Sequence, residues 1–128
     1  MEITPDMLMH RMEMEVVEVT PTKSIIRMPV EGNRQTAGYL HGGATAALAE
    51  TAGSFSANAH AQTLSEDSRA VGVELSIQHI SSAKDGFVTA TATAVHLGRT
   101  RCVHRVEITD EGGKTVSVAL ISNQIIRR

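Results

Sequence analysis

Aromatic residues are scarce in this 128-residue sequence, which contains one tyrosine, two phenylalanines and no tryptophan. The core must therefore be built from Val, Ile, Leu, Ala and Met, and the aromatic platforms on which single-stranded nucleic acids stack are missing. The formal net charge is −2, so the chain also lacks a basic field that would attract phosphates. Together these absences argue against nucleic acid as a partner.

Cysteine, targeting signals and long apolar runs are scarce as well. The single cysteine, Cys102, excludes an internal disulfide framework and suits a reducing compartment. The first twenty residues carry acids throughout and lack the basic start and apolar run of a secretory signal. No stretch approaches the roughly 18 apolar residues that a membrane-spanning helix needs. We therefore expect a cytoplasmic protein with no membrane partner.

The apolar pattern predicts strands, then one long helix, then more strands. Alternation over 12–30, broken by turn chemistry at 20–22, predicts two antiparallel strands or one bent hairpin after a short helix over 7–11. The Ala-rich stretch 42–61 predicts a long helix, which polar residues 62–68 close. Further strands are predicted over 70–80, 87–96, 101–109 and 115–126, with hairpin turns at 84–86, 97–99 and 110–113. This order predicts an antiparallel sheet packed on one central helix, in one domain over residues 1–128.

The strand over 70–80 alternates cleanly. It is predicted to place Val71, Val73, Leu75 and Ile77 on one face, and Gly72, Glu74, Ser76 and Gln78 on the other. His79 shares the apolar face. A core histidine with one hydrogen bond is the commoner explanation, and a histidine facing a polar site is the alternative.

Glu50 is the only charged residue between Arg34 and Glu66, in the middle of the predicted long helix. An isolated helical glutamate usually lies on the solvent face. Polar neighbours favour a functional role instead, because Ser54 follows one turn later and His41 lies at the helix entrance.

Two glycines, Gly42 and Gly43, open the same helix. Unblocked N–H groups and the helix dipole at such a start can stabilise the negative oxygen of a carbonyl under attack. Simple entry of the chain into the helix explains the two glycines slightly better on spacing alone. Arg99 and Arg101 flank a predicted turn and can hold a phosphorylated ligand tail, although ordinary surface charge is the simpler explanation.

Other kinds of site find little support. No histidine pair has the i, i+4 spacing of a helical metal site and Cys102 stands alone, so neither metal nor cofactor is expected. Ser54 lacks a nucleophile-elbow context, and no glycine fingerprint for nucleotide phosphates follows a strand.

The segment QTAGYLHGGATAALAETAGS, residues 35–54, resembles the hotdog-fold acyl-CoA thioesterases. The resemblance is strongest to the hydroxybenzoyl-CoA and phenylacetate-pathway branch, close to the thioesterases of enterobactin and menaquinone biosynthesis. VGVEL at 71–75, His79 and HLGR at 96–99 also match. The resemblance implies an α+β hotdog fold, in which an antiparallel sheet of five or six strands wraps around one long central helix.

The resemblance also implies roles for individual residues. Glu50 matches the catalytic carboxylate, acting as nucleophile or general base, and the Gly42 amide matches the group that polarises the thioester carbonyl. Gln35 and His41 match polar groups at the thioester, and Ser54 matches one that orients the acyl ring or the water. The implied acyl-CoA groove is lined by Gly72, His79, Ile80, Ser81, Ser82, His96, Leu97, Gly98, Arg99, Thr100 and Arg101. Ser81 departs from relatives that carry arginine there, so a phosphate contact is lost or passes to Lys84, Arg99 or Arg101.

The spacing of Gly42 and Glu50 bears on assembly. Eight residues along one helix correspond to roughly 12 Å, so one carbonyl cannot meet both groups within a chain. This agrees with the composite dimer sites that the resemblance implies. We expect hydrolysis of an aryl- or medium-chain acyl-CoA by a homodimer as the minimal active unit, within a homotetramer. A non-catalytic acyl-CoA sensor is the main alternative, and a hotdog hydratase is disfavoured because its Asp–His pair is not found.

Overall fold

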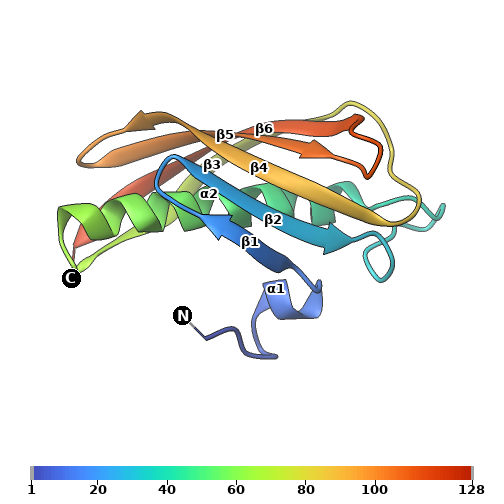
Figure 1. The fold of residues 1–128 in the computed structure, drawn as a ribbon, viewed down its shortest axis with the longest axis horizontal. Helices are drawn as coiled ribbons and strands as arrows, with labels where there is room; N and C mark the ends of the chain where they lie inside the picture. The colour runs from blue at the N-terminus through green and yellow to red at the C-terminus, as the bar shows by residue number, and fades with distance from the viewer. Residues whose placement is uncertain (1, 128) are drawn as a thin grey trace.

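The computed structural model describes residues 2–127, which form two helices and six strands (Figure 1). The helices are α1 (Leu8–Arg11) and α2 (Gly42–Leu64). The strands are β1 (Glu15–Val19), β2 (Lys23–Pro29), β3 (Ser68–His79), β4 (Phe87–Leu97), β5 (Arg101–Thr109) and β6 (Thr115–Arg127). All six strands join in one antiparallel sheet, ordered β1-β2-β4-β5-β6-β3, that wraps around α2. The predicted α+β architecture, a sheet around one central helix, is confirmed.

Small residues let α2 lie close against the sheet. Ala49, Ala52 and Ala57 are completely buried, and a Cβ on Gly53 would lie only 2.1 Å from Ile121 Cγ2. The helix runs on to Leu64, beyond the predicted end at residue 61 and into the polar stretch 62–68 predicted to close it. This end was predicted too early because the polar residues of the last turn lie on the exposed face, where polarity does not interrupt a helix.

The core is aliphatic, as the scarcity of aromatics predicts. Its five largest fully buried apolar side chains come from β2, α2, β5 and β6: Ile26, Met28, Leu48, Ile108 and Ile121. Burial of each such side chain contributes roughly 1.5–3 kcal/mol. No helix among residues 2–127 is long and apolar enough to cross a membrane.

Strand β3 departs from the predicted alternation. Its register against β6 shifts at Val73, so one extra residue is inserted next to Gly72. Val71 and Val73 are 40% and 51% exposed, whereas Leu75 and Ile77 pack against the core. The prediction that these four side chains share one face was wrong, because a bulge exchanges the two faces of a strand.

One predicted hairpin was wrong for a topological reason. β3 pairs with β6 at the sheet edge, and β4 pairs with β2 and β5, so the segment 80–86 crosses over between distant strands. The turns at 97–99 and 110–113 do join neighbouring strands. Turn residues indicate where a chain reverses but not which strand its next segment will pair with.

Candidate active site

The amino-terminal end of α2 carries an unoccupied backbone amide. His41 caps the helix: its Nδ1 accepts a hydrogen bond from Gly43 N–H at 2.7 Å. Its carbonyl oxygen accepts from the amides of Ala44 and Thr45. Within residues 2–127, the Gly42 N–H has no hydrogen-bond acceptor. His41 therefore uses up the neighbouring donors, and Gly42 retains a free N–H where the helix dipole is positive.

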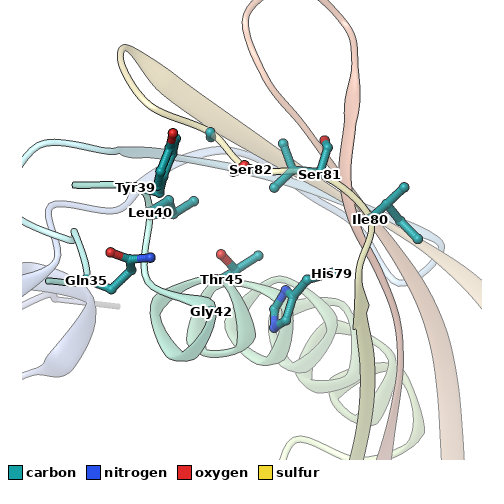
Figure 2. Close-up of a pocket in the computed structure, with 11 residues that line it drawn as sticks. Gln35, Tyr39, Leu40, Gly42, Thr45, His79, Ile80, Ser81 and Ser82 are labelled. Atoms are coloured by element: carbon teal, nitrogen blue, oxygen red, sulfur yellow. The ribbon is translucent and has the colours of Figure 1, made fainter. Parts of the chain in front are cut away.

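This amide faces a cavity of about 420 Å³ (Figure 2), a volume within the usual range for small-molecule sites. The lining contains no lysine, arginine or carboxylate: Gln35, Tyr39, Leu40, Gly42, Thr45, His79, Ile80, Ser81, Ser82, Ala83 and Val116. A negative charge that develops in this cavity can therefore be stabilised only by His79 and by the dipoles of the lining backbone and polar side chains.

His79 lies directly against Gly42. A Cβ on residue 42 would be 2.8 Å from His79 Nε2, so a glycine is needed for this close approach. The other ring nitrogen, Nδ1, is 2.8 Å from the hydroxyl of buried Ser117. Figure 2 shows the ring over the first turn of α2. Of the two explanations for His79, the structure favours a site-facing histidine over a core one.

Gln35 supplies a second donor to the cavity. Its Oε1 accepts from the backbone N–H of Ala37, and its own backbone N–H donates to the carbonyl of Tyr39 at 2.7 Å. Gly38, with φ +95°, permits this tight loop. Because the oxygen is occupied, the side-chain nitrogen is the free end of the Gln35 amide, and in Figure 2 it points toward the cavity.

Glu50 and Ser54 line a different cavity, of about 380 Å³. The other residues around it are Met7, Leu8, Met9, Ala47, Thr51, Phe55 and Asn58. The exposed Glu50 carboxylate lies over β3, where a Cβ on Gly72 would be 2.9 Å from its Oε2. The two cavities share no lining residue, so the chain does not bring Glu50 to Gly42.

The predicted groove segment His96–Arg101 lies away from both cavities. His60 Nε2 is 2.7 Å from the Gly98 carbonyl, which fixes this turn to the carboxyl-terminal part of α2. Arg101 donates to the side chain of Gln124 at 3.1 Å. Figure 1 shows the β4–β5 turn at the opposite end of the molecule from the start of α2. Of the other groove residues, Ile80, Ser81 and Ser82 lie in the Gly42 cavity and Gly72 lies beside Glu50.

Comparison with known proteins gives this geometry a context. The pattern of the Thioesterase superfamily matches residues 37–117. The chain belongs to this superfamily. A 1,4-dihydroxy-2-naphthoyl-CoA hydrolase from Listeria monocytogenes is 36% identical over 113 residues, covering 88% of this chain and 89% of that one. The expected enzyme class, a thioesterase hydrolase, is thus confirmed at the level of the family.

Solved structures of thioesterases share the fold. One from Haemophilus influenzae is 30% identical, with a TM-score of 0.88, and the match covers 96% of this chain and 85% of that one. A Staphylococcus aureus thioesterase is 34% identical, with a TM-score of 0.84 and coverage of 92% and 97%. That structure contains a glutamine-to-alanine variant, and another structure of the same protein contains a glutamate-to-alanine variant. The predicted hotdog fold is confirmed.

Several residues of this candidate site were not predicted. Tyr39 and Thr45 line the Gly42 cavity, and Thr45 could have been found because it lies one turn after His41. Ser117 holds His79 from a strand far along the chain, and Asn123 accepts a hydrogen bond from Ser54. No local sequence signal identifies these last two residues, because sheet pairing alone brings them to the site.

Proposed function

We propose that this thioesterase hydrolyses an aryl- or medium-chain acyl-CoA to the free acid and coenzyme A. The observation that carries the proposal is the free Gly42 amide, which faces a cavity together with Gln35 and His79. Such donors stabilise the oxygen of a thioester carbonyl as it becomes negative. Glu50 acts as nucleophile or as general base on water, and the thiolate of coenzyme A leaves.

Two comparisons support these roles. The Listeria relative is named for hydrolysis of an aromatic acyl-CoA. In the Staphylococcus thioesterase, the substituted glutamine and glutamate are fifteen positions apart, the same separation as Gln35 and Glu50.

We infer that each active site is shared by two protomers. α2 separates Gly42 from Glu50 by roughly 12 Å along its axis, and no side-chain rotation closes that distance. One protomer therefore supplies Gly42, and its partner supplies Glu50. The homodimer is then the minimal active unit.

The edge strand β3 is the surface that fits this assembly. It lies at the end of the sheet, is twelve residues long, and leaves Val71 and Val73 exposed. A long, apolar edge is a template for pairing with another chain. Antiparallel pairing of two β3 strands reverses one protomer against the other. The Gly42 end of one then approaches the Glu50 cavity and the β4–β5 turn of its partner.

In that arrangement Arg99 and Arg101 are available for the phosphates of coenzyme A, with His96, Leu97, Gly98 and Thr100 along the groove.

The homotetramer, the cytoplasmic location and the assignment of residues 1–128 to one hotdog thioesterase domain remain predictions.

Thiol release from a panel of aryl and aliphatic acyl-CoAs tests the activity. We expect wild-type turnover, and its near-complete loss in Glu50→Gln, which keeps the shape of the side chain but removes the carboxylate. Retained turnover in this variant would remove Glu50 from the mechanism. Binding of acyl-CoA without any thiol release by wild type would indicate a sensor.

Two substitutions of Gly42 isolate its amide. Gly42→Ala and Gly42→Pro both add a Cβ that crowds His79, but only proline removes the N–H. Proline is tolerated at the first position of a helix, and the extended His41 suits the residue before it. We expect kcat to fall further in Gly42→Pro than in Gly42→Ala, by a factor on the order of 10²–10³. Equal kcat values in the two variants would exclude a catalytic role for the Gly42 N–H.

Mixed dimers test the shared site. Glu50→Gln and Gly42→Pro, each inactive alone, are expressed together. Random pairing makes half of the dimers mixed, and each of these has one intact site of two, so about a quarter of wild-type turnover should return. No recovery, despite proven mixed dimers, would refute a site shared between protomers.

A further inference from the structure

A buried amide lies directly behind the Glu50 cavity. Asn123 on β6 is completely buried, and its Oδ1 accepts a hydrogen bond from Ser54 Oγ at 3.2 Å. Its Nδ2 has no hydrogen-bond partner among residues 2–127. A buried amide that is only partly paired destabilises a fold, so its presence calls for a reason other than packing.

The hydrogen bond of Ser54 leaves the helix. A serine or threonine within a helix commonly donates to the carbonyl one turn earlier. Thr45 does so to His41, and Thr51 does so to Ala47. Ser54 instead donates across to Asn123 on β6, and Ser56 likewise bonds to a sheet residue, Ser24 on β2.

The direction of this bond sets what Ser54 can offer to a ligand. A hydroxyl has one proton and two lone pairs, and an amide oxygen only accepts. Ser54 therefore gives its proton to Asn123 and keeps lone pairs for the cavity that Glu50 also lines. A ligand at this position meets two acceptors, the Ser54 oxygen and the Glu50 carboxylate.

We propose that Asn123 is a positioning residue, which makes Ser54 an acceptor beside Glu50 and so orients the water that hydrolysis consumes. The proposal rests on the proposed function, in which a water reacts next to Glu50. Water is the molecule with two protons to give, one to each acceptor, and it keeps a lone pair on its oxygen for attack.

The reaction balances with water in this orientation. The water oxygen bonds to the thioester carbon while one proton passes to Glu50. The carbon–sulfur bond then breaks, its electron pair stays on sulfur, and Glu50 returns the proton to the thiolate. If Glu50 attacks first, the same water cleaves the resulting anhydride.

A double-mutant cycle tests whether Asn123 acts through Ser54. Asn123→Leu removes the amide at similar volume, and Ser54→Ala removes the hydroxyl. We expect each to lower kcat by roughly tenfold with KM unchanged, and the double variant to lower kcat by the same roughly tenfold. Independent effects, with a roughly hundredfold fall in the double variant, would overturn the proposal. If Asn123→Leu does not fold, Asn123→Ala completes the same cycle.

Asn123→Asp tests the direction of the hydrogen bond. In alkaline buffer its carboxylate can only accept from Ser54, so we expect folded Asn123→Asp to keep a kcat well above that of Asn123→Leu. An equal loss in both variants would mean that Ser54 donates into the cavity, against the proposal.

Two further measurements separate the possible failures. Ser24→Ala removes another buried hydroxyl, whose partner is Ser56 and which lies outside the Glu50 cavity. It should lose stability while kcat stays unchanged. If wild-type turnover depends on Glu50 but the two substitutions lower kcat independently, the proposed role of Asn123 is wrong and the proposed function stands. If wild type releases no thiol, the proposed function fails as well.

Discussion

Substitution of Gly72 by alanine should separate activity from stability. A Cβ on residue 72 would lie 2.9 Å from Glu50 Oε2, where ordinary contacts are 3.4–4 Å. The carboxylate must therefore retreat by about half an ångström from its place over β3, and misplacement of a reacting group on this scale lowers kcat by roughly tenfold. The Glu50 side chain is exposed and can move without disturbing the core.

Stability should respond in the opposite direction. Alanine restricts the unfolded chain more than glycine does, so the free energy of unfolding should stay constant or rise by up to ~1 kcal/mol. Turnover of an acyl-CoA and urea denaturation, measured on the same preparation, give both quantities. Gly112→Ala is the matched control, because its Cβ would meet only Asp110 Oδ1, at 3.5 Å. Its kcat should equal that of wild type.

The outcome that refutes this reasoning is a Gly72→Ala protein with wild-type kcat, since the carboxylate position would then not matter. An increase in KM alone would instead indicate that the methyl group blocks the substrate.

Two predictions concern the fold. Gly53→Ala should lower the free energy of unfolding by about 1–3 kcal/mol, because the new Cβ would lie 2.1 Å from Ile121 Cγ2. Helix propensity alone predicts that the free energy of unfolding rises by up to ~1 kcal/mol. The sign of the change measured in urea denaturation therefore shows whether the clash with Ile121 or helix propensity dominates. Burial lowers the pKa of His104, helped by nearby His60 and partly opposed by the hydrogen bond to the Pro21 carbonyl. The unfolded chain then binds more protons than the fold, and stability should fall as pH drops below roughly 6.5. His104→Gln should flatten this dependence in denaturation curves measured across that range, and an unchanged slope would exclude His104 as its source.

The order of the elements could be predicted because it depends on local chemistry. Alternating apolar residues marked β2 and β5, and a run of alanines without proline marked α2. Partners in the sheet could not be predicted in this way. β3 lies beside β6 rather than β4, because strand pairing depends on which sheet edge is open.

The same distinction between local sequence signals and non-local pairing applies to the candidate site. Glu50 stands out as the only charged residue between Arg34 and Glu66, and Gly42 and His41 stand out because they lie at the start of the same predicted helix. Their supporting residues do not stand out. Ser117 and Asn123 are ordinary strand residues in the sequence, and only the three-dimensional fold aims the first at His79 and the second at Ser54.

The bulge in β3 connects the local and the non-local parts of this site. Gly72 and His79 are an odd number of residues apart, so a regular strand would place them on opposite faces. The extra residue at Val73 restores a common face. Gly72 therefore reaches Glu50 while His79 reaches Gly42, both on the helix-facing side of one strand. The irregularity that made the sequence pattern misleading is the feature that lets a single edge strand serve both halves of the proposed site.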